Sequence, residues 1–253
     1  GSPSFTDIRK FTINGTACEA SFAGTFSAKK MLPEGSISVR RLVLPGGTSF
    51  SLDAYLQSDS NRFSFLVPLL KINDASFSSI DVSASRSSGT IEFNLSAYDS
   101  TGHISAEGSL LQDSGRFLQL YAAFDSISVA NAVNAALSVA RPDDPDLRSS
   151  LGKALNPYEL TTEVYFSTDF TNISFNCTRL VLASSEKDGL YVLLSLKGNQ
   201  DGVDISDIDF SRGGYTIAGN VYAKFATEGG IILDSALTVN SIPYKMSGMY
   251  SKN

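Results

Sequence analysis

Apolar and polar residues alternate along almost the whole of this 253-residue chain. In the segment SFSLDAYLQ, for example, Phe50 and Leu52 fall on one side, whereas Ser51 and Asp53 fall on the other. Successive side chains of a strand point to opposite faces, so the pattern predicts strands with one apolar and one polar face. Short Gly-containing segments such as 212–214 separate these stretches and predict hairpin turns. We expect about sixteen strands, mostly antiparallel, because one wet face per sheet is typical of antiparallel pairing.

Two positions interrupt this alternation. The pattern slips by one residue at Arg40-Arg41, which predicts a β-bulge there. Pro68 follows an alternating stretch, and proline cannot donate a backbone hydrogen bond to a neighbouring strand. We therefore expect Pro68 at the end of a strand or on an edge strand.

The segment 126–155 is the only long part of the chain that does not follow the strand pattern. Ser126 or Ser128 is expected to cap a helix, because a hydroxyl accepts a hydrogen bond from a free amide of the first turn. Apolar residues then recur every three or four positions from Ile127 to Leu137, as on one face of a helix.

Two prolines limit these predicted helices. Pro142 should end the first helix, since its ring removes a donor and restricts the residue before it. Asp146 is expected to cap a second, shorter helix, which Pro157 stops. The sequence thus predicts a helical hairpin between two β-rich halves.

The composition limits the partners of this chain. Apolar residues make up 42% and charged residues only 18%, which is typical of β-structure outside the cytosol. The formal net charge of −6 argues against nucleic acid or an anionic membrane surface, since both need a basic patch. No stretch of about 18 apolar residues predicts a spanning helix. We interpret residues 1–2 as a cloning remnant before a single β-rich domain, 3–253, cut from a longer protein.

The sequence contains no pattern typical of an enzyme. His103, the only histidine, follows a Ser-Thr-Gly turn, and we interpret it as a solvent-facing turn residue. The acidic run 201–209 lacks the bidentate Glu that closes a calcium loop, so it predicts a turn and a strand. We expect no catalytic residue, no metal site and no cofactor. Cys18 and Cys177 are interpreted as buried thiols, with a disulfide between the two β-rich halves as the alternative.

The apolar strand faces are compatible with two folds. They could close on one another as a sandwich or barrel with a dry core. They could instead line one long curved sheet, a U-shaped apolar groove (a β-taco), which needs an apolar occupant such as acyl chains. Small residues on the apolar side, including Gly24 and Gly219, favour strong curvature or close approach. The strand pattern alone leaves both folds open.

Three segments carry a family resemblance. An amphipathic strand, LQLYAAFDSIS, leads into the helix ANAVNAALSV, a Pro/Asp loop and a second short helix. The predicted strands after the helices include the segment DIDFSRGGYTIAGNVYAKF. In it, a Gly turn joins a polar-alternating strand to a strand with an internal Gly. With these features, the segment from Leu118 to Phe225 resembles the AsmA-like superfamily, and especially TamB-type proteins of diderm (Gram-negative) bacteria. The inner-membrane anchor helix and the C-terminal docking segment of that family are missing, as expected for a piece from the middle.

This resemblance implies the U-shaped groove, which we therefore predict, with the closed β-sandwich as the alternative. It also implies a periplasmic bridge for lipid transport. Such proteins are similar in fold to eukaryotic bridge-like lipid transfer proteins. A hydrophobic groove would shield phospholipid acyl chains between inner and outer membrane, headgroups would stay in water, and outer membrane biogenesis would be supported. The implied partners are phospholipid and, through parts of the chain not present here, the inner membrane as anchor and an outer-membrane barrel assembly protein. Nucleic acid is not expected.

The predicted groove lining consists of apolar residues from several strands. It comprises Leu52, Phe63, Phe65, Ile91, Phe93, Leu95, Ile173, Phe175, Val192, Leu194, Ile217 and Val221. The alternative function is an extracellular or surface interaction module, an adhesin-like sandwich or solenoid with a closed core and no lipid. An outer-membrane barrel would need aromatic girdles and a polar lumen, and a carbohydrate-active enzyme would need two placed carboxylates, for which the sequence offers no pair.

Overall fold

A computed structural model describes residues 5–27, 33–44, 46–59, 61–112, 115–186, 189–225 and 230–250. The predicted cloning remnant at residues 1–2 lies outside these ranges. The chain divides into two compact units. Unit 1 comprises Gly1–Glu107 and Ile127–Asn156, and unit 2 comprises Gly108–Ser126 and Pro157–Asn253. Both helices therefore belong to unit 1.

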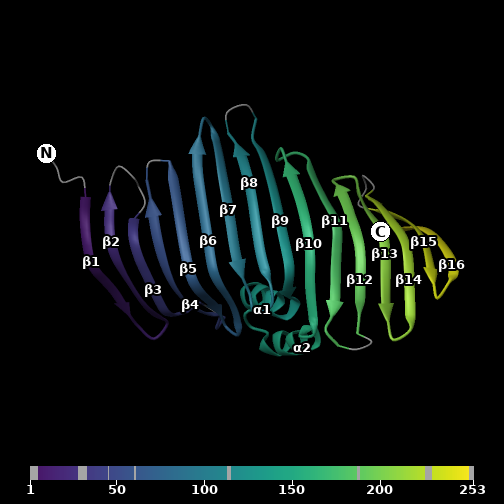
Figure 1. Cartoon of the computed structure of the whole chain (residues 1–253), viewed down its shortest axis with the longest axis horizontal. Helices are drawn as coiled ribbons and strands as arrows, with labels where there is room; N and C mark the ends of the chain where they lie inside the picture. Colours follow the sequence, from purple (N-terminus) through teal and green to yellow (C-terminus); the bar gives the residue numbers. More distant parts are fainter. Residues whose placement is uncertain are drawn as a thin grey trace. The chain divides into compact units, whose positions relative to one another are not determined.

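The described residues form sixteen strands and two helices (Figure 1). The elements before and within the helical hairpin are β1 (Phe5–Asn14), β2 (Cys18–Ser27), β3 (Pro33–Val43), β4 (Ser49–Ser58), β5 (Arg62–Ile72), β6 (Ala75–Ser87), β7 (Thr90–Tyr98), β8 (His103–Leu111), β9 (Phe117–Ser128), α1 (Val129–Ala140) and α2 (Pro145–Leu155). Those after it are β10 (Tyr158–Thr168), β11 (Ile173–Ser184), β12 (Tyr191–Asn199), β13 (Gly202–Arg212), β14 (Tyr215–Phe225), β15 (Ile231–Val239) and β16 (Ile242–Tyr250).

The sixteen strands follow one another in chain order in a single antiparallel sheet. Among the described residues, β1 and β16 are its two edge strands, so the sheet is open. This confirms the prediction of a mainly β, antiparallel sheet of sixteen strands with a short helical hairpin. The alternative of a closed β-sandwich is wrong, because all described strands belong to one sheet and none remains to form a second layer.

The strand register fixes which side chains of unit 1 share a face, because directly paired residues point to the same side. Leu56 pairs with Phe65, which pairs with Val82, which in turn pairs with Leu95. We call the face that carries this row the apolar face of unit 1. Its most buried part is a cluster of three residues from β4 and β5, namely Ala54, Leu56 and Val67. The alternating residues Asp53, Tyr55 and Gln57 lie exposed on the opposite, polar face.

Helix α1 begins at one of the two predicted caps. The Ser128 hydroxyl accepts a hydrogen bond from the backbone amide of Asn131. Ile127 still belongs to strand β9, so the predicted helical stripe begins too early. The helix ends at Ala140, two residues before Pro142, as the restriction by proline predicts.

Helix α2 begins differently from the prediction. Asp146 was expected as its cap, but Asp144 accepts the hydrogen bond from the Leu147 amide, and Asp146 lies in the first turn. Pro145 occupies the first helical position, where its missing N–H costs nothing. The acidic Pro/Asp loop therefore contributes the cap one position before the proline.

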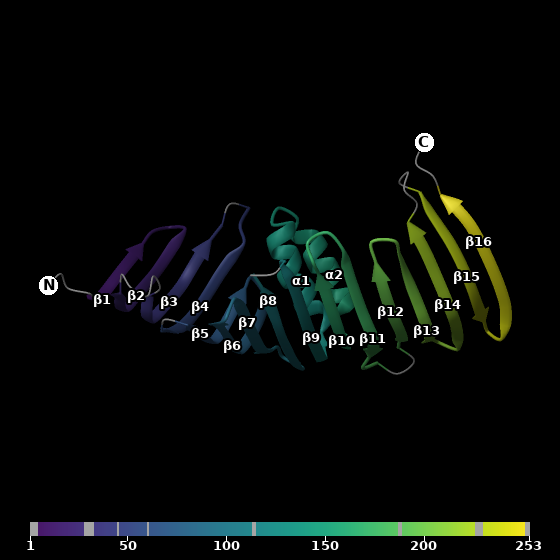
Figure 2. The same ribbon diagram turned by 90° about the horizontal axis from the view of Figure 1, so that it is seen from above.

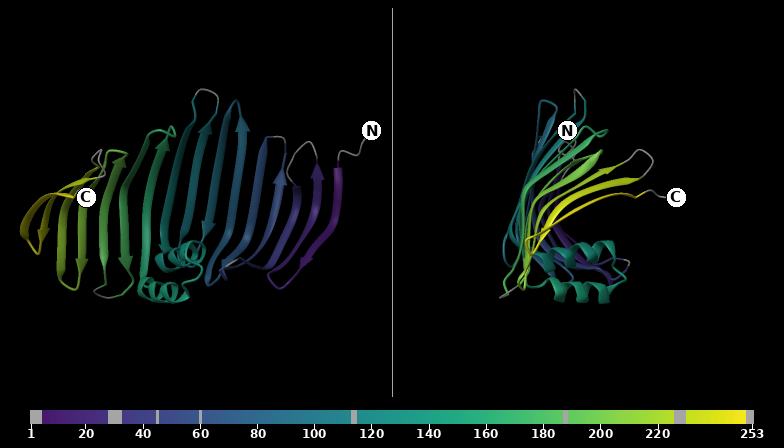
Figure 3. Two further views of the ribbon diagram at one scale, coloured as in Figure 1. Left: turned by 180° about the vertical axis from the view of Figure 1, so that it is seen from behind. Right: turned by 90° about the vertical axis from the view of Figure 1, so that its right-hand side faces the viewer.

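Helix α1 lies across one end of the strands of unit 1 (Figure 3). The Thr48 hydroxyl, just before β4, donates a hydrogen bond to the Ser138 carbonyl. The Asn73 side chain, after β5, donates to the Ser138 hydroxyl at 2.8 Å. The apolar-face residues Ala75 and Ala97 at this end are only 1% and 5% exposed. The helix therefore covers one end of the apolar face.

Of the predictions for the two positions that interrupt the alternation, one is confirmed and one is wrong. The bulge at Arg40-Arg41 is confirmed, since the pairing with β4 shifts between Val39 and Leu42. The prediction for Pro68 is wrong: it lies inside β5, which is paired on both sides. The pairing with β4 shifts beside Pro68, so its missing N–H coincides with an irregularity, where proline is tolerated.

A line of bulges also crosses unit 2. The register shifts between Cys177 and Leu180 on β11 and between Ile205 and Ile208 on β13. It also shifts where Leu194 of β12 alone faces two residues of β13. A bulge bends its strand and increases the local twist, so neighbouring bulges bend the sheet along one line. Strand β16, whose pairing with β15 has no register shift, also curves along its length (Figure 2).

Side chains satisfy the polar groups that the bulges remove from the ladder. The Ser195 hydroxyl lies 2.8 Å from the Thr178 carbonyl and 3.0 Å from the Asp207 carboxylate. The Asp207 amide donates to the Asn220 side-chain oxygen at 3.3 Å. These contacts run across four strands on the polar face.

Candidate functional site

The structure brings the six predicted lining residues of unit 1 onto its apolar face. Phe63 and Phe93 both pair with Ala84 of β6, one from each side. The rings of Phe63 and Phe65 stack with centroids 6.4 Å apart. All six, Leu52, Phe63, Phe65, Ile91, Phe93 and Leu95, are half-buried. Phe63 and Phe65 therefore pack on each other, and all six side chains remain partly accessible to solvent.

The six predicted residues of unit 2 also share one face, which we call the apolar face of unit 2. Val192 pairs with Phe210, which pairs with Ile217. Leu194 lies opposite the bulge of β13, and Val221 pairs with Ile205. Ile173 is 45% exposed, and the other five, Phe175, Val192, Leu194, Ile217 and Val221, are half-buried.

Two glycines on this face lie close to atoms of neighbouring strands. Gly198 pairs directly with Phe175, and a methyl group on Gly198 would come within 2.5 Å of the end of the Phe175 ring. Gly219 has a φ of +140°, and a side chain there would overlap the backbone of β15 at Ala236. Position 219 therefore requires glycine, whereas at Gly198 the Phe175 ring covers the space that the missing side chain leaves.

Further apolar residues of the two faces were not among the predicted lining residues. Some are direct cross-strand partners of predicted residues, such as Leu70 opposite Leu52 and Phe210 opposite Val192. The others lie on the same faces of further strands, so the register is needed to find them. In unit 1 the further residues include Phe22, Ile37, Leu70 and Val82, and in unit 2 Phe166, Leu196, Ile205, Phe210 and Leu237. On the last two strands the apolar side chains are more exposed: Leu233 at 43%, Ile242 at 57% and Met246 at 56%.

The accessible surface is too large for closed cores. The chain exposes 15956 Å². One compact monomer of this mass would expose about 10,800 Å², and two separate compact domains of half the mass about 13,000 Å². In the described residues, only eight apolar side chains are fully buried. The apolar faces therefore remain accessible to an apolar ligand.

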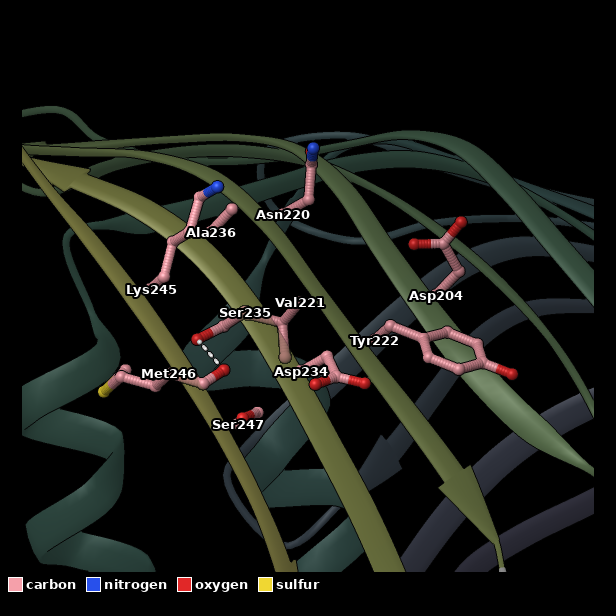
Figure 4. A pocket seen from close by; sticks show the side chains of 10 residues that line it. All are labelled: Asp204, Asn220, Val221, Tyr222, Asp234, Ser235, Ala236, Lys245, Met246 and Ser247. Carbon is pink, nitrogen blue, oxygen red and sulfur yellow. Dashed lines mark hydrogen bonds between the residues drawn. The ribbon is translucent and has the colours of Figure 1, made fainter.

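A hollow of about 430 Å³ lies over β13 to β16 (Figure 4). The register places Asp204, Tyr222 and Asp234 in one row and Asn220 and Lys245 in another, both on the polar face. The backbone of the row between them forms its floor. This hollow is therefore separate from the apolar face of unit 2.

The residues singled out for chemistry have structural partners. His103 is half-buried, with its Nε2 2.9 Å from the Ser96 hydroxyl and its ring 4.5 Å from that of Tyr98. It is thus a packed polar-face residue rather than the solvent-facing one expected. Cys18 and Cys177 are both free, so the disulfide alternative is wrong. Cys177 is 3% exposed, as expected for a buried thiol, whereas Cys18 is half-buried.

Metal-ligating side chains do not converge anywhere in the part of the chain that the structure describes. In the same residues, neither helix has the length and hydropathy needed to cross a membrane. The accessible apolar faces thus remain the most prominent candidate site.

The fold and the site define an open antiparallel β protein with a helical hairpin and accessible apolar faces. No family model, curated protein or solved structure matches this chain.

Proposed function

We propose that this chain is a segment of a periplasmic bridge of the AsmA-like, TamB type, which carries phospholipid between the inner and the outer membrane and supports outer-membrane biogenesis. One observation carries the proposal: each unit has an apolar face whose Phe, Leu, Ile and Val side chains are only half-buried. Large accessible apolar surfaces of soluble domains mark binding sites. Acyl chains are occupants that need no polar partner.

The proposed mechanism is passive. Each methylene group that leaves water for an apolar surface gains about 0.8 kcal/mol, so two acyl chains are held without specific contacts. A lining of this kind lets a lipid slide, because no hydrogen bond has to break along the path. The mechanism requires no catalytic residue and no cofactor. Anchoring in the inner membrane and contact with an outer-membrane barrel assembly protein are assigned to other parts of the longer protein.

The direct experiment is native mass spectrometry with lipid extraction after size-exclusion chromatography. We expect phospholipid to remain bound to the purified chain. A lipid-free protein that also fails to take up labelled phospholipid from vesicles would overturn the proposal and favour an interaction module.

Neighbouring residues provide matched variants of opposite faces. Phe93→Asp introduces a carboxylate into the apolar face of unit 1, whereas Asn94→Asp introduces the same charge on the polar face. Phe175→Asp and Asn176→Asp form the corresponding pair in unit 2. A carboxylate beside an acyl chain loses hydration without a partner, so lipid retention should fall in the Phe variants only.

A further inference from the structure

A second cavity, of about 410 Å³, lies in unit 1 between the two helices and the β5–β6 turn. Its lining is Asn73, Asp74, Asn134, Ser138, Pro145, Arg148, Ser149, Gly152, Lys153 and Asn156. Four of the α2 residues, at positions 148, 149, 152 and 153, share one side of that helix because they are spaced by one turn. The cavity is therefore a feature of the helical hairpin, not of the sheet.

A glycine sets the distance between the helices at this cavity. A methyl group on Gly152 would lie 2.9 Å from the side-chain oxygen of Asn134 and 3.0 Å from its nitrogen. Glycine at this position brings α2 up against the Asn134 side chain. The polar groups of both helices thus converge on one space.

Two cations of the lining lack an acidic partner. In the described part of the chain, neither the Arg148 guanidinium nor the Lys153 ammonium lies within ion-pair distance of a carboxylate. Arg148 makes one long contact, 3.5 Å from its Nη1 to the Pro142 carbonyl. Asp74 is the only acid in the lining, so the cavity has a net positive charge.

Neutral donors accompany the cations. The side chains of Asn134, Ser149 and Asn156 line the cavity and have no hydrogen-bond partner in the described residues. Guanidinium and ammonium groups together with amide and hydroxyl donors form the usual ligand set of a phosphate group. The volume is sufficient for a phosphate ester.

We propose that this cavity binds a phosphate group, and that its source is the headgroup of a phospholipid. Asn73 directly follows Ile72, which pairs with Phe50 on the apolar face, so the cavity adjoins the end of that face. A lipid with its chains on the apolar face of unit 1 reaches the cavity with its headgroup. Only the choice of a lipid as source rests on the proposed function; free phosphate is the other source of the same chemistry.

The test is a titration of the protein with glycerophosphoethanolamine, glycerophosphoglycerol and inorganic phosphate, followed by amide NMR signals of Ser149 and Gly152. These compounds have no acyl chains, so their titration measures binding to the cavity without binding to the apolar face. We expect saturable shifts, and at least about tenfold weaker binding in the double variant Arg148→Gln/Lys153→Gln, since two charge-assisted hydrogen bonds are lost. Tighter binding of the two diesters than of inorganic phosphate identifies the headgroup as the source, and the reverse order overturns that assignment.

The matched control is Arg179→Gln/Lys197→Gln, which removes the same charges from exposed positions of unit 2. It should bind like the unchanged protein. If the double variant does not fold, Lys153→Gln alone, an exposed position, should weaken binding. Absence of shifts with all three compounds, or equal shifts in the Arg148/Lys153 variants, overturns the proposal. NMR shifts without lipid retention would support phosphate binding in this cavity and overturn the proposed function. Lipid retention without NMR shifts would support the proposed function and overturn phosphate binding in the cavity.

Discussion

The side-chain amide of Asn131 forms two hydrogen bonds with the backbone of Ser76. The Ser76 amide donates to the Asn131 side-chain oxygen at 3.0 Å, and the Asn131 side-chain nitrogen donates to the Ser76 carbonyl at 2.9 Å. Strand β7 ends at Tyr98, opposite Ser78, so Ser76 lies beyond the last pair on that side. A helix side chain thus replaces the peptide group of a missing strand neighbour, and it fixes α1 to the sheet of unit 1.

We predict that Asn131→Ala lowers the free energy of unfolding by about 1–3 kcal/mol, because a half-buried amide and carbonyl lose their partners. Urea denaturation followed by circular dichroism measures this change. Asn94→Ala, at an exposed position of β7, is the control and should stay within about 0.5 kcal/mol of the unchanged protein. Equal effects of the two substitutions would show that Asn131 does not anchor the helix.

The alternation of the sequence was sufficient to predict the strands and the faces, because side-chain direction in a strand depends only on parity. It placed Phe93 and Leu194 on the apolar side correctly without knowledge of their neighbours. The role of Asn131 was not predictable, since its partner Ser76 is 55 residues away in sequence. The cavity beside Arg148 likewise depends on how two helices meet, which spacing along one helix does not define.

One bulge was predicted from the sequence, and another with the same slip in the alternation was not. At Arg40-Arg41 the alternation visibly slips, and the bulge was predicted. The same slip occurs between Ile205 and Ile208, but the acidic residues there drew the interpretation toward a turn and a plain strand. The structure shows that this segment is a bulge and not a plain strand, since the backbone of Asp207 has a φ of +53°.

We predict that Asp207→Val destabilises unit 2 by about 1–3 kcal/mol, since a β-branched residue is strained at positive φ. Asp207→Asn should cost less than about 1 kcal/mol, because Asn tolerates this conformation. Thermal unfolding of the two variants under identical conditions measures the difference. A Val variant as stable as the Asn variant would contradict a strained bulge at this position.

A substitution at Gly24 tests how closely β2 and β3 approach each other. A methyl group at Gly24 would overlap the Glu34 carbonyl oxygen and lie 2.7 Å from the Cα atom of Gly35. We predict that Gly24→Ala lowers stability by about 1–3 kcal/mol, as overpacking does. Gly15→Ala is the control, because a methyl group there would meet its nearest atom at 3.5 Å, an ordinary contact. Similar unfolding midpoints in urea for the two variants would argue against this close pairing.

The two thiols should differ in reactivity with a thiol reagent. Cys177 is 3% exposed, and its sulfur lies 2.9 Å from the Thr162 hydroxyl, whereas Cys18 is half-buried. We predict that Cys18 reacts in the folded protein and that Cys177 reacts only after unfolding. Labelling followed by peptide mass spectrometry, with Cys18→Ser as the control, measures both rates. Fast labelling of Cys177 in native buffer would contradict its buried position.

The β10–β11 turn should respond to acid through Asp169. Hydrogen bonds from the backbone and the side chain of Asn172, and from the Thr171 amide, lower the pKa of this carboxyl from its usual 3.8. Because the folded pKa is below the unfolded one, the charged carboxylate stabilises the turn above about pH 4, and this contribution disappears as the pH falls through the folded pKa.

We predict an NMR titration midpoint of the Asp169 carboxyl below 3.8. Asn172→Ala removes the side-chain donor but keeps the backbone donors, so it should move the midpoint only part of the way back toward 3.8. The stability difference between the unchanged protein and Asp169→Ala should shrink as the pH falls below about 4, since a protonated carboxyl accepts these hydrogen bonds less well. A midpoint at or above 3.8 in the unchanged protein would show that the turn does not hold the carboxylate in this way.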